Sequence, residues 1–233
     1  MTCEICGGRG YVESEDDAGT VRVRECRCAI ESRQRERVAK LLEESGITQE
    51  QLRRWSFGTF DIARCAGNAA LRARMAEIVD DLRSYAQEPI GWRVLQGMYG
   101  VGKTHLAYAV AAHRARVGSP VYVATVPDLL DMLRRGFDDD SYDKRLRMLQ
   151  TVPMLVLDDL GTENATPFAV EKLHQVVDAR YRTRLPMVVT TNRLLHQDKT
   201  LPGRIVSRLL DRDLSVVWTL PVGDYRRVTH ADR

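Results

Sequence analysis

The segment Gly97-x4-Gly102-Lys103-Thr104 constrains the fold of this chain more than any other feature of its sequence. It follows a short apolar stretch over residues 92–96 and precedes a helical pattern over residues 103–117. Glycines let backbone N–H groups turn inward around an anion, and the start of the following helix adds partial positive charge. In that context the spacing predicts a phosphate-binding loop rather than a chance glycine-rich turn.

The residue types of this loop fit a nucleoside triphosphate bound with magnesium. Lys103 can reach the β- and γ-phosphates, and the hydroxyl of Thr104 can bind Mg2+. We therefore predict ATP and Mg2+ as ligands. The predicted nucleotide-binding residues in and after the loop are Gly97, Gly100, Val101, Gly102, Lys103, Thr104 and His105.

An acidic pair, Asp158 and Asp159, follows a second apolar stretch at Met154–Leu157. An apolar strand that ends in carboxylates places them at the carboxyl edge of the sheet, where open α/β folds bind ligands. Asp158 is suited to bind the nucleotide's Mg2+ through water, and Asp159 is suited to polarise the attacking water. A solvated acidic loop is the alternative interpretation, which an apolar strand downstream of the phosphate loop disfavours.

Another polar tip, Asn192, follows the apolar stretch Val188–Thr191. A neutral amide at this place can hydrogen-bond the attacking water or the γ-phosphate without adding charge, so we include Asn192 among the catalytic candidates. An asparagine that only begins a turn is the alternative for this residue taken alone.

Short apolar strands alternate with helical patterns from Trp92 onward. This alternation predicts an α/β fold with a parallel sheet covered on both faces. The expected strands lie near residues 92–96, 120–125, 152–158, 185–191 and 214–219. The expected helices lie near residues 29–42, 69–85, 103–117, 127–135, 167–182 and 203–211.

The composition is that of a globular protein, with 44% hydrophobic and 29% charged residues in a chain of 233. Its apolar runs are too short to span a bilayer, and the N-terminus shows no basic-then-apolar leader, so we expect a cytoplasmic location without a membrane partner. A net charge of +3 does not by itself imply a polyanionic partner. Three basic groups, near residues 33–40, 134–147 and 204–227, are each interpreted either as solvated helix faces or as nucleic-acid surfaces.

Four cysteines near the N-terminus, Cys3, Cys6, Cys26 and Cys28, mark a separate unit. This unit has too little apolar content to form a core, and disulfides are rare inside cells, so a metal is the better explanation for its cohesion. Four thiolates in two close pairs predict a structural zinc site, with free thiols as the alternative. The remaining Cys65 reads as an ordinary thiol.

Four segments in this order resemble the AAA+ ATPases, and more closely the DnaC/DnaI-type bacterial helicase loaders and their IstB-type relatives. They are Leu157–Glu163, Leu185–Asn192, Arg204–Leu209 and Asp224–Arg226, within a resemblance that covers about residues 50–228. The resemblance implies a P-loop AAA+ core with a five-stranded parallel sheet in the order 5-1-4-3-2. It also implies ATP-dependent self-assembly on single-stranded DNA and a partnership with a hexameric replicative helicase.

The resemblance also implies roles for single residues. Lys103 and Thr104 would be the Walker A lysine and magnesium ligand, Asp158 and Asp159 the Walker B pair, and Asn192 sensor 1. Arg208 would be an arginine finger acting on the ATP of a neighbouring subunit, with Arg204 as an assistant one turn earlier. A surface arginine paired with Asp211 or Asp213 is the alternative for Arg208.

Two departures from the family pattern bear on mechanism. Asp159 stands where most AAA+ ATPases have glutamate, and its shorter side chain predicts slow hydrolysis. Only about a dozen residues of the sequence follow the last expected strand, so we expect no full helical lid. Arg226 is the candidate to replace the sensor 2 arginine of such a lid.

We therefore predict a zinc-binding module with a linker helix at residues 1–49, forming the partner-binding region, and an AAA+ ATPase domain at residues 50–233. The predicted function is the ATP-dependent loading of a replicative helicase, with slow ATP hydrolysis in an oligomer on single-stranded DNA. An IstB-type regulator of transposition that binds duplex DNA is the main alternative, and a small-molecule P-loop kinase is the more remote one. A kinase does not need the Asn192 and Arg208 elements.

Overall fold

A five-stranded parallel sheet forms the centre of the protein, in a computed structural model that describes residues 3–15, 20–64, 68–162 and 166–221. The strand order is β4-β5-β6-β3-β7, which is the expected order 5-1-4-3-2 when the strands are numbered from the phosphate loop. Each expected strand is present, with bounds within two residues of those predicted. The strands are β3 (Trp92–Gln96), β4 (Val121–Thr125), β5 (Met154–Leu160), β6 (Met187–Thr191) and β7 (Ser215–Thr219).

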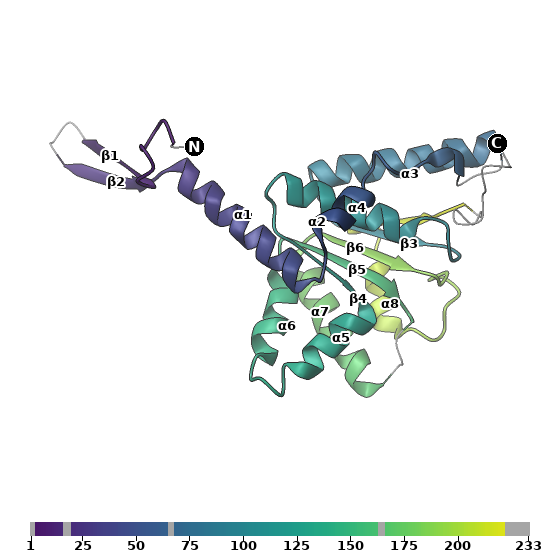
Figure 1. Cartoon of the computed structure of the whole chain (residues 1–233). Helices are drawn as coiled ribbons and strands as arrows, with labels where there is room; N and C mark the ends of the chain where they lie inside the picture. The colour runs from purple at the N-terminus through teal and green to yellow at the C-terminus, as the bar shows by residue number, and fades with distance from the viewer. Residues whose placement is uncertain (1–2, 16–19, 65–67, 163–165, 222–233) are drawn as a thin grey trace.

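Helices cover both faces of this sheet, as the alternating pattern predicts (Figure 1). One face carries α2 (Gln49–Arg54), α3 (Ala69–Gln87) and α4 (Lys103–Arg116), and the other carries α5 (Val126–Arg135), α6 (Tyr142–Thr151), α7 (Pro167–Thr183) and α8 (Gly203–Leu209). Strand side chains alternate between the two cores: Val123 packs with α3 and α4, whereas its neighbours Tyr122 and Ala124 pack with α5 and α6.

Helix starts follow the local chemistry of their sequences. Thr166 accepts a hydrogen bond from the Ala169 N–H at 3.2 Å, with Pro167 at the first helical position of α7. Asn68 caps α3 in the same way, through the Leu71 N–H. The sequence patterning did not predict α6, whose residues are largely polar and carry few apolar positions.

The N-terminal unit lies at the far end of the long helix α1 (Arg27–Glu44), which projects from the sheet domain (Figure 1). It contains an antiparallel hairpin, β1 (Tyr11–Glu15) and β2 (Val21–Glu25), that sequence reasoning did not predict. The other end of α1 is anchored, because Val38, Leu41 and Leu42 are buried in the two cores of the sheet domain.

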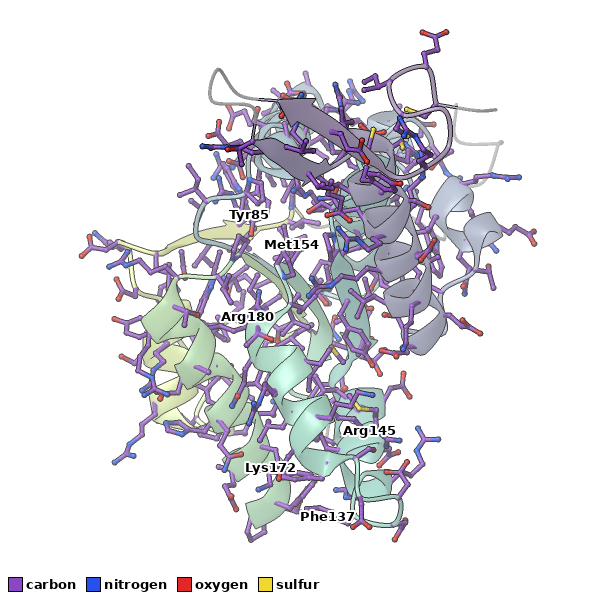
Figure 2. All side chains as sticks on the ribbon, turned by 90° about the vertical axis from the view of Figure 1, so that its left-hand side faces the viewer. Tyr85, Phe137, Arg145, Met154, Lys172 and Arg180 are labelled. Atoms are coloured by element: carbon purple, nitrogen blue, oxygen red, sulfur yellow. The ribbon has the colours of Figure 1, made fainter. Side chains whose placement is uncertain are left out.

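A fully buried arginine, Arg180 of α7, connects the C-terminal end of α6 to the residue before β6, at the end of the sheet opposite the phosphate loop. Its guanidinium donates hydrogen bonds to the carbonyls of Leu149, Val152 and Pro186 at 2.5–3.0 Å (Arg180 is labelled in Figure 2). These carbonyls lie at the end of α6 and just before β6, so the buried cation joins a helix end to the sheet. Burial lowers the pKa of Arg180 to about 10.

Candidate nucleotide site and cysteine centre

The predicted phosphate loop connects the end of β3 to the start of α4. Gly97, Gly100 and Gly102 all have positive φ angles, of 142°, 79° and 96°. Gly102 is constrained in a second way, because a Cβ built at this position would lie 2.7 Å from a ring carbon of Phe60. The loop therefore has the backbone that turns N–H groups inward, and side chains at Gly102 are excluded on two grounds.

Lys103 extends its ammonium group along the inside of this loop. Its Nζ donates hydrogen bonds to the carbonyls of Gly97 and Met98 at 2.8 and 2.7 Å, and to Oδ1 of Asn192 at 2.7 Å. The side chain is 5% exposed. Two residues that are 89 positions apart in sequence, and that we predicted separately as phosphate and γ-phosphate contacts, thus meet at one point.

The predicted magnesium ligands also meet. Thr104 Oγ1 lies 3.1 Å from Oδ1 of Asp158, and the hydroxyl of Thr190 donates to the same oxygen at 2.5 Å. Burial raises the pKa of Asp158 to about 6, reinforced by the charge of Asp159 and opposed by the two hydroxyls and Lys103. A hydroxyl and a buried carboxylate side by side, next to the predicted phosphate loop, are oxygen donors of the kind that Mg2+ binds together with water and nucleotide phosphates.

Asp159 lies on a bulge at the end of β5. Its φ angle is +57°, a left-handed conformation that aspartate tolerates better than most residues, and the pairing of β5 with β6 shifts register between Leu157 and Leu160. Asp159 is half-buried, and its N–H donates to Thr190 Oγ1 at 2.9 Å. The two acids differ in burial, because Asp158 is buried whereas Asp159 is half-buried.

A segment between α2 and α3 packs on the loop and was not predicted to be part of the site. His105 Nε2 lies 3.0 Å from the Ser56 carbonyl, and its ring meets Phe60 edge to face at 5.1 Å. One turn further along α4, Tyr108 meets Trp55 at 4.7 Å. Burial lowers the pKa of His105, which favours the neutral ring. The clustering of Trp55, Phe57 and Phe60 in the sequence was the available signal for this contact.

Arg208, the predicted finger, is bound within its own subunit. Its guanidinium pairs with Asp178 of α7, lies 3.1 Å from His174 Nε2 and stacks over the Tyr181 ring at 5.5 Å. The pairing therefore involves α7 rather than Asp211 or Asp213, the partners considered in the sequence-based alternative. Arg204, one turn earlier, is exposed, whereas Cys65 and Arg226 lie outside the described residues.

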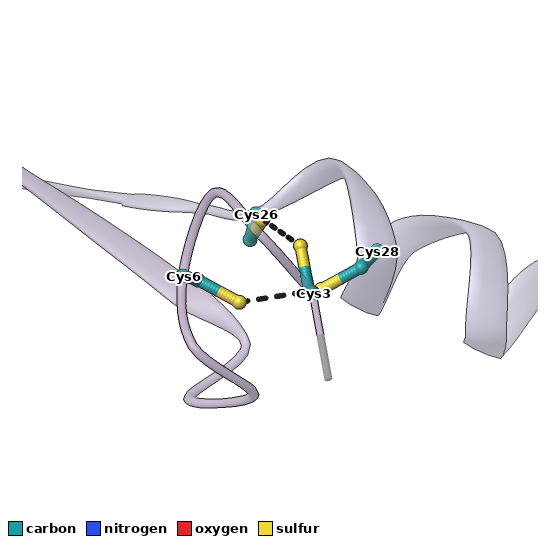
Figure 3. A group of neighbouring side chains, drawn as sticks. All are labelled: Cys3, Cys6, Cys26 and Cys28. Atoms are coloured by element: carbon teal, nitrogen blue, oxygen red, sulfur yellow. Dashed lines mark hydrogen bonds between the residues drawn. The ribbon is translucent and has the colours of Figure 1, made fainter. Parts of the chain in front are cut away.

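The four predicted zinc ligands converge on one point at the end of α1 (Figure 3). The Sγ atoms of Cys3 and Cys26 are 3.8 Å apart, those of Cys6 and Cys28 are 3.4 Å apart, and all four lie within 4.8 Å of one another. Zinc–sulfur bonds of about 2.3 Å at tetrahedral angles place ligand sulfurs about 3.8 Å apart. The cluster therefore fits one zinc ion.

The peptide around these cysteines is shaped for the cluster. Gly7, Gly8 and Gly10 have positive φ angles, and the Gly10 N–H lies 3.4 Å from the Cys6 sulfur. That N–H group is the main cause lowering the pKa of Cys6 to about 6, whereas hydrogen bonding with Cys6 is the main cause raising the pKa of Cys28 to about 12. One of the glycines that follow Cys6 in the sequence, Gly10, thus donates its backbone N–H to the Cys6 sulfur.

The sequence profile of the family described as IstB-like ATP binding protein matches residues 72–228 of this chain. The uncharacterized protein YdaV of Escherichia coli K12 is 34% identical over 177 residues, covering 76% of this chain and 68% of YdaV. A putative ATP-binding protein in an insertion sequence of Mycobacterium tuberculosis, Rv3427c, is 32% identical over 175 residues, covering 72% of this chain and 68% of that protein. The replicative helicase loader DnaI of Bacillus subtilis is 30% identical over 122 residues, covering 52% of this chain and only 39% of DnaI.

Solved structures show the same fold. A crystal structure of the DnaC helicase loader superposes with a TM-score of 0.60 at 23% identity, covering 73% of this chain and 99% of that one. A DnaI crystal structure gives 0.59 at 23% identity, covering 75% and 95%. The described part of the chain contains no helix long and apolar enough to cross a membrane. The chain thus belongs to the IstB-like family of ATP-binding proteins and has the AAA+ fold of the DnaC and DnaI structures.

Proposed function

We propose that this protein hydrolyses ATP at the tips of β3, β5 and β6. The observation that supports the proposal is the contact of Lys103 with Asn192 beside the Thr104–Asp158 pair, because these contacts connect three elements that were predicted separately. Lys103 would bind the β- and γ-phosphates, and Thr104 and Asp158 would hold Mg2+. Lys103 would exchange loop carbonyls for phosphate oxygens, since an ammonium group binds anionic oxygen more strongly.

In the proposed reaction, a water oxygen bonds to the γ-phosphorus while the bridging bond to ADP breaks. Asp159 accepts a hydrogen bond from that water, and Asn192 fixes the water or the γ-phosphate through its amide. The shorter reach of aspartate, compared with glutamate, leaves the water less well placed, so we propose a slow ATPase. The products are ADP and hydrogen phosphate, and one proton of the attacking water is released to solvent.

We further propose that Arg208 completes the site of a neighbouring subunit. It sits on α8 with the exposed Arg204 one turn earlier, and its own carboxylate partner, Asp178, is only partly buried. A γ-phosphate with its larger negative charge can compete for the guanidinium once a second subunit is in place. Hydrolysis would then depend on self-association.

The biological role we propose is the ATP-dependent loading of a replicative DNA helicase onto single-stranded DNA. The support is the DnaI relative, together with an N-terminal cysteine cluster that lies apart from the ATPase site and could serve a partner-binding region. We propose residues 1–49 as the partner-binding region and residues 50–233 as the ATPase domain. Regulation of transposition is the second candidate, because Rv3427c belongs to an insertion sequence.

Affinity capture from the native host distinguishes the two roles. A tagged full-length chain with ATP should retain a hexameric replicative helicase, identified by mass spectrometry. The purified pair should then place the helicase on circular single-stranded DNA, and a Lys103→Ala chain should fail to do so. Capture of a transposase, with binding to duplex rather than single-stranded DNA, would replace the loader proposal by the transposition one.

A further inference from the structure

One residue of β6, Thr190, lies opposite two residues of β5. Leu157 pairs with Val189, and the next registered pair is Leu160 with Thr191. Both acids of the proposed ATPase site, Asp158 and Asp159, therefore fall within the interval that β6 spans with Thr190 alone. A bulge of this kind leaves a backbone group outside the regular ladder of hydrogen bonds.

The hydroxyl of Thr190 contacts both acids at once. It donates its hydrogen to Oδ1 of Asp158 at 2.5 Å and accepts a hydrogen bond from the backbone N–H of Asp159 at 2.9 Å. Thr190 is fully buried. The two bonds use different parts of the hydroxyl, the hydrogen for one acid and an oxygen lone pair for the other.

The second of these bonds acts on a strained peptide. Asp159 has a φ of +57°, a left-handed conformation that is unfavourable for a residue other than glycine and persists only where surrounding contacts offset its cost. The Thr190 oxygen is the partner that replaces the missing ladder bond of Asp159. The orientation of the Asp159 carboxylate, which follows from the backbone, is thereby tied to the same hydroxyl that orients Asp158.

We propose that Thr190 is the positioning residue of the ATPase site, whose single hydroxyl sets the direction of the Mg2+-binding acid and of the water-polarising acid together. The inference rests on the proposed function of these two acids. Thr190 would touch neither nucleotide nor water, and would act only through Asp158 and Asp159.

Three substitutions distinguish the effect of the Thr190 hydroxyl from the effect of its side-chain volume. Thr190→Val keeps the shape and removes both hydrogen bonds, and Thr190→Ser keeps both bonds and removes a methyl group. Thr191→Val is the matched control, since Thr191 is equally buried on the same strand but its hydroxyl bonds the Leu160 carbonyl and the Arg193 N–H instead of an acid. If Thr190→Val does not fold, Thr190→Ala takes its place with the same expectations.

The first measurement is amide hydrogen exchange at Asp159 by NMR, which needs neither nucleotide nor activity. We expect the Asp159 amide to be protected in the unmodified protein, in Thr190→Ser and in Thr191→Val. In Thr190→Val it should exchange roughly 10- to 100-fold faster, the range that corresponds to one lost hydrogen bond in a buried site. Equal protection in Thr190→Val would overturn the proposal.

The second measurement is nucleotide binding with and without Mg2+, followed by steady-state hydrolysis. Thr190→Val should bind ATP in EDTA like the unmodified protein, yet lose about tenfold or more of the affinity that Mg2+ adds, and its kcat should fall more than its KM rises. Thr190→Ser should restore both. A Thr190→Ser chain as defective as Thr190→Val, or a Thr191→Val chain that loses as much, would show that packing and not the hydroxyl matters.

The two measurements also separate this inference from the proposed function. If the unmodified protein does not hydrolyse ATP, the proposed function fails, while the exchange of the Asp159 amide still reports whether Thr190 holds the bulge. If hydrolysis is present and the Asp159 amide is indifferent to Thr190→Val, the positioning role fails and the ATPase stands.

Discussion

Replacing Asp158 by Asn should stabilise the protein in the absence of Mg2+ while disabling its proposed metal site. Asp158 is 2% exposed, and burial raises the pKa of its carboxyl from 3.8 to about 6. The folded protein therefore holds the Asp158 proton more tightly than the unfolded chain does. The stability contributed by the neutral form is present below pH 3.8 and is lost as the pH rises through 6.

The size of the effect follows from the two pKa values. A difference of about two pH units at 1.36 kcal/mol each makes ionised Asp158 cost about 3 kcal/mol at pH 8, falling to about 1.5 kcal/mol at pH 5. Both hydroxyl contacts, from Thr104 and Thr190, go to Oδ1, so the amide oxygen of asparagine can keep them. We expect Asp158→Asn to gain most of this energy at pH 8 and about half as much at pH 5.

Urea denaturation of both chains at the two pH values, in EDTA, gives the comparison. Asp138→Asn, at an exposed loop position, controls for the loss of one negative charge. Mg2+ should strengthen ATP binding to the unmodified protein and to Asp138→Asn, but not to Asp158→Asn. A destabilised Asp158→Asn chain, or a gain that is the same at pH 5 and pH 8, would refute the assignment of Asp158 as a buried carboxyl under electrostatic strain.

Three other results are expected. Metal analysis of protein purified without chelator should find one zinc per chain, and Cys28→Ser should lower that ratio while ATP binding persists; a ratio near zero would exclude the zinc site. Arg208→Ala should bind ATP but hydrolyse it at least 100-fold more slowly, and mixing it with a Lys103→Ala chain should recover part of the activity; full activity of Arg208→Ala alone would dismiss the finger. Gly102→Ala should weaken ATP binding at least tenfold, because its Cβ would meet Phe60 at 2.7 Å and its φ of +96° suits glycine; calorimetry that shows unchanged affinity would contradict the loop geometry.

The parts of the fold that were predictable carry strong local signals. The apolar strands are buried on both faces and read as continuous apolar runs, such as Met154–Leu157, and glycines mark the phosphate loop. The meeting of Lys103 with Asn192 was predictable as well, because parallel strands bring their carboxyl ends to one edge of the sheet. The spacing of the four N-terminal cysteines was sufficient to predict their cluster.

The parts that were not predictable depend on tertiary contacts. The strands of hairpin β1–β2 are only five residues long, and Val21 and Val23, which alternate with arginines along β2, are exposed rather than packed in a core. The hairpin therefore lacks the buried apolar run that marks the strands of the central sheet. The Asp178 partner of Arg208 lies 30 residues away, on a helix whose packing no local pattern specifies. The role of Thr190 depends on a bulge, and a one-residue shift of register leaves no mark in the sequence of either strand.

Isothermal titration calorimetry with ATP and Mg2+, on the unmodified chain and on Lys103→Ala, tests the central claim most directly. Lys172→Ala is the control for the general loss of a buried cation, because Lys172 is also buried but lies on α7, whereas Lys103 lies on α4. We expect binding at one site per chain in the unmodified protein and in Lys172→Ala, and no measurable binding in a folded Lys103→Ala chain. Unchanged affinity of Lys103→Ala for ATP would contradict the assignment of Gly97–Thr104 as the nucleotide site.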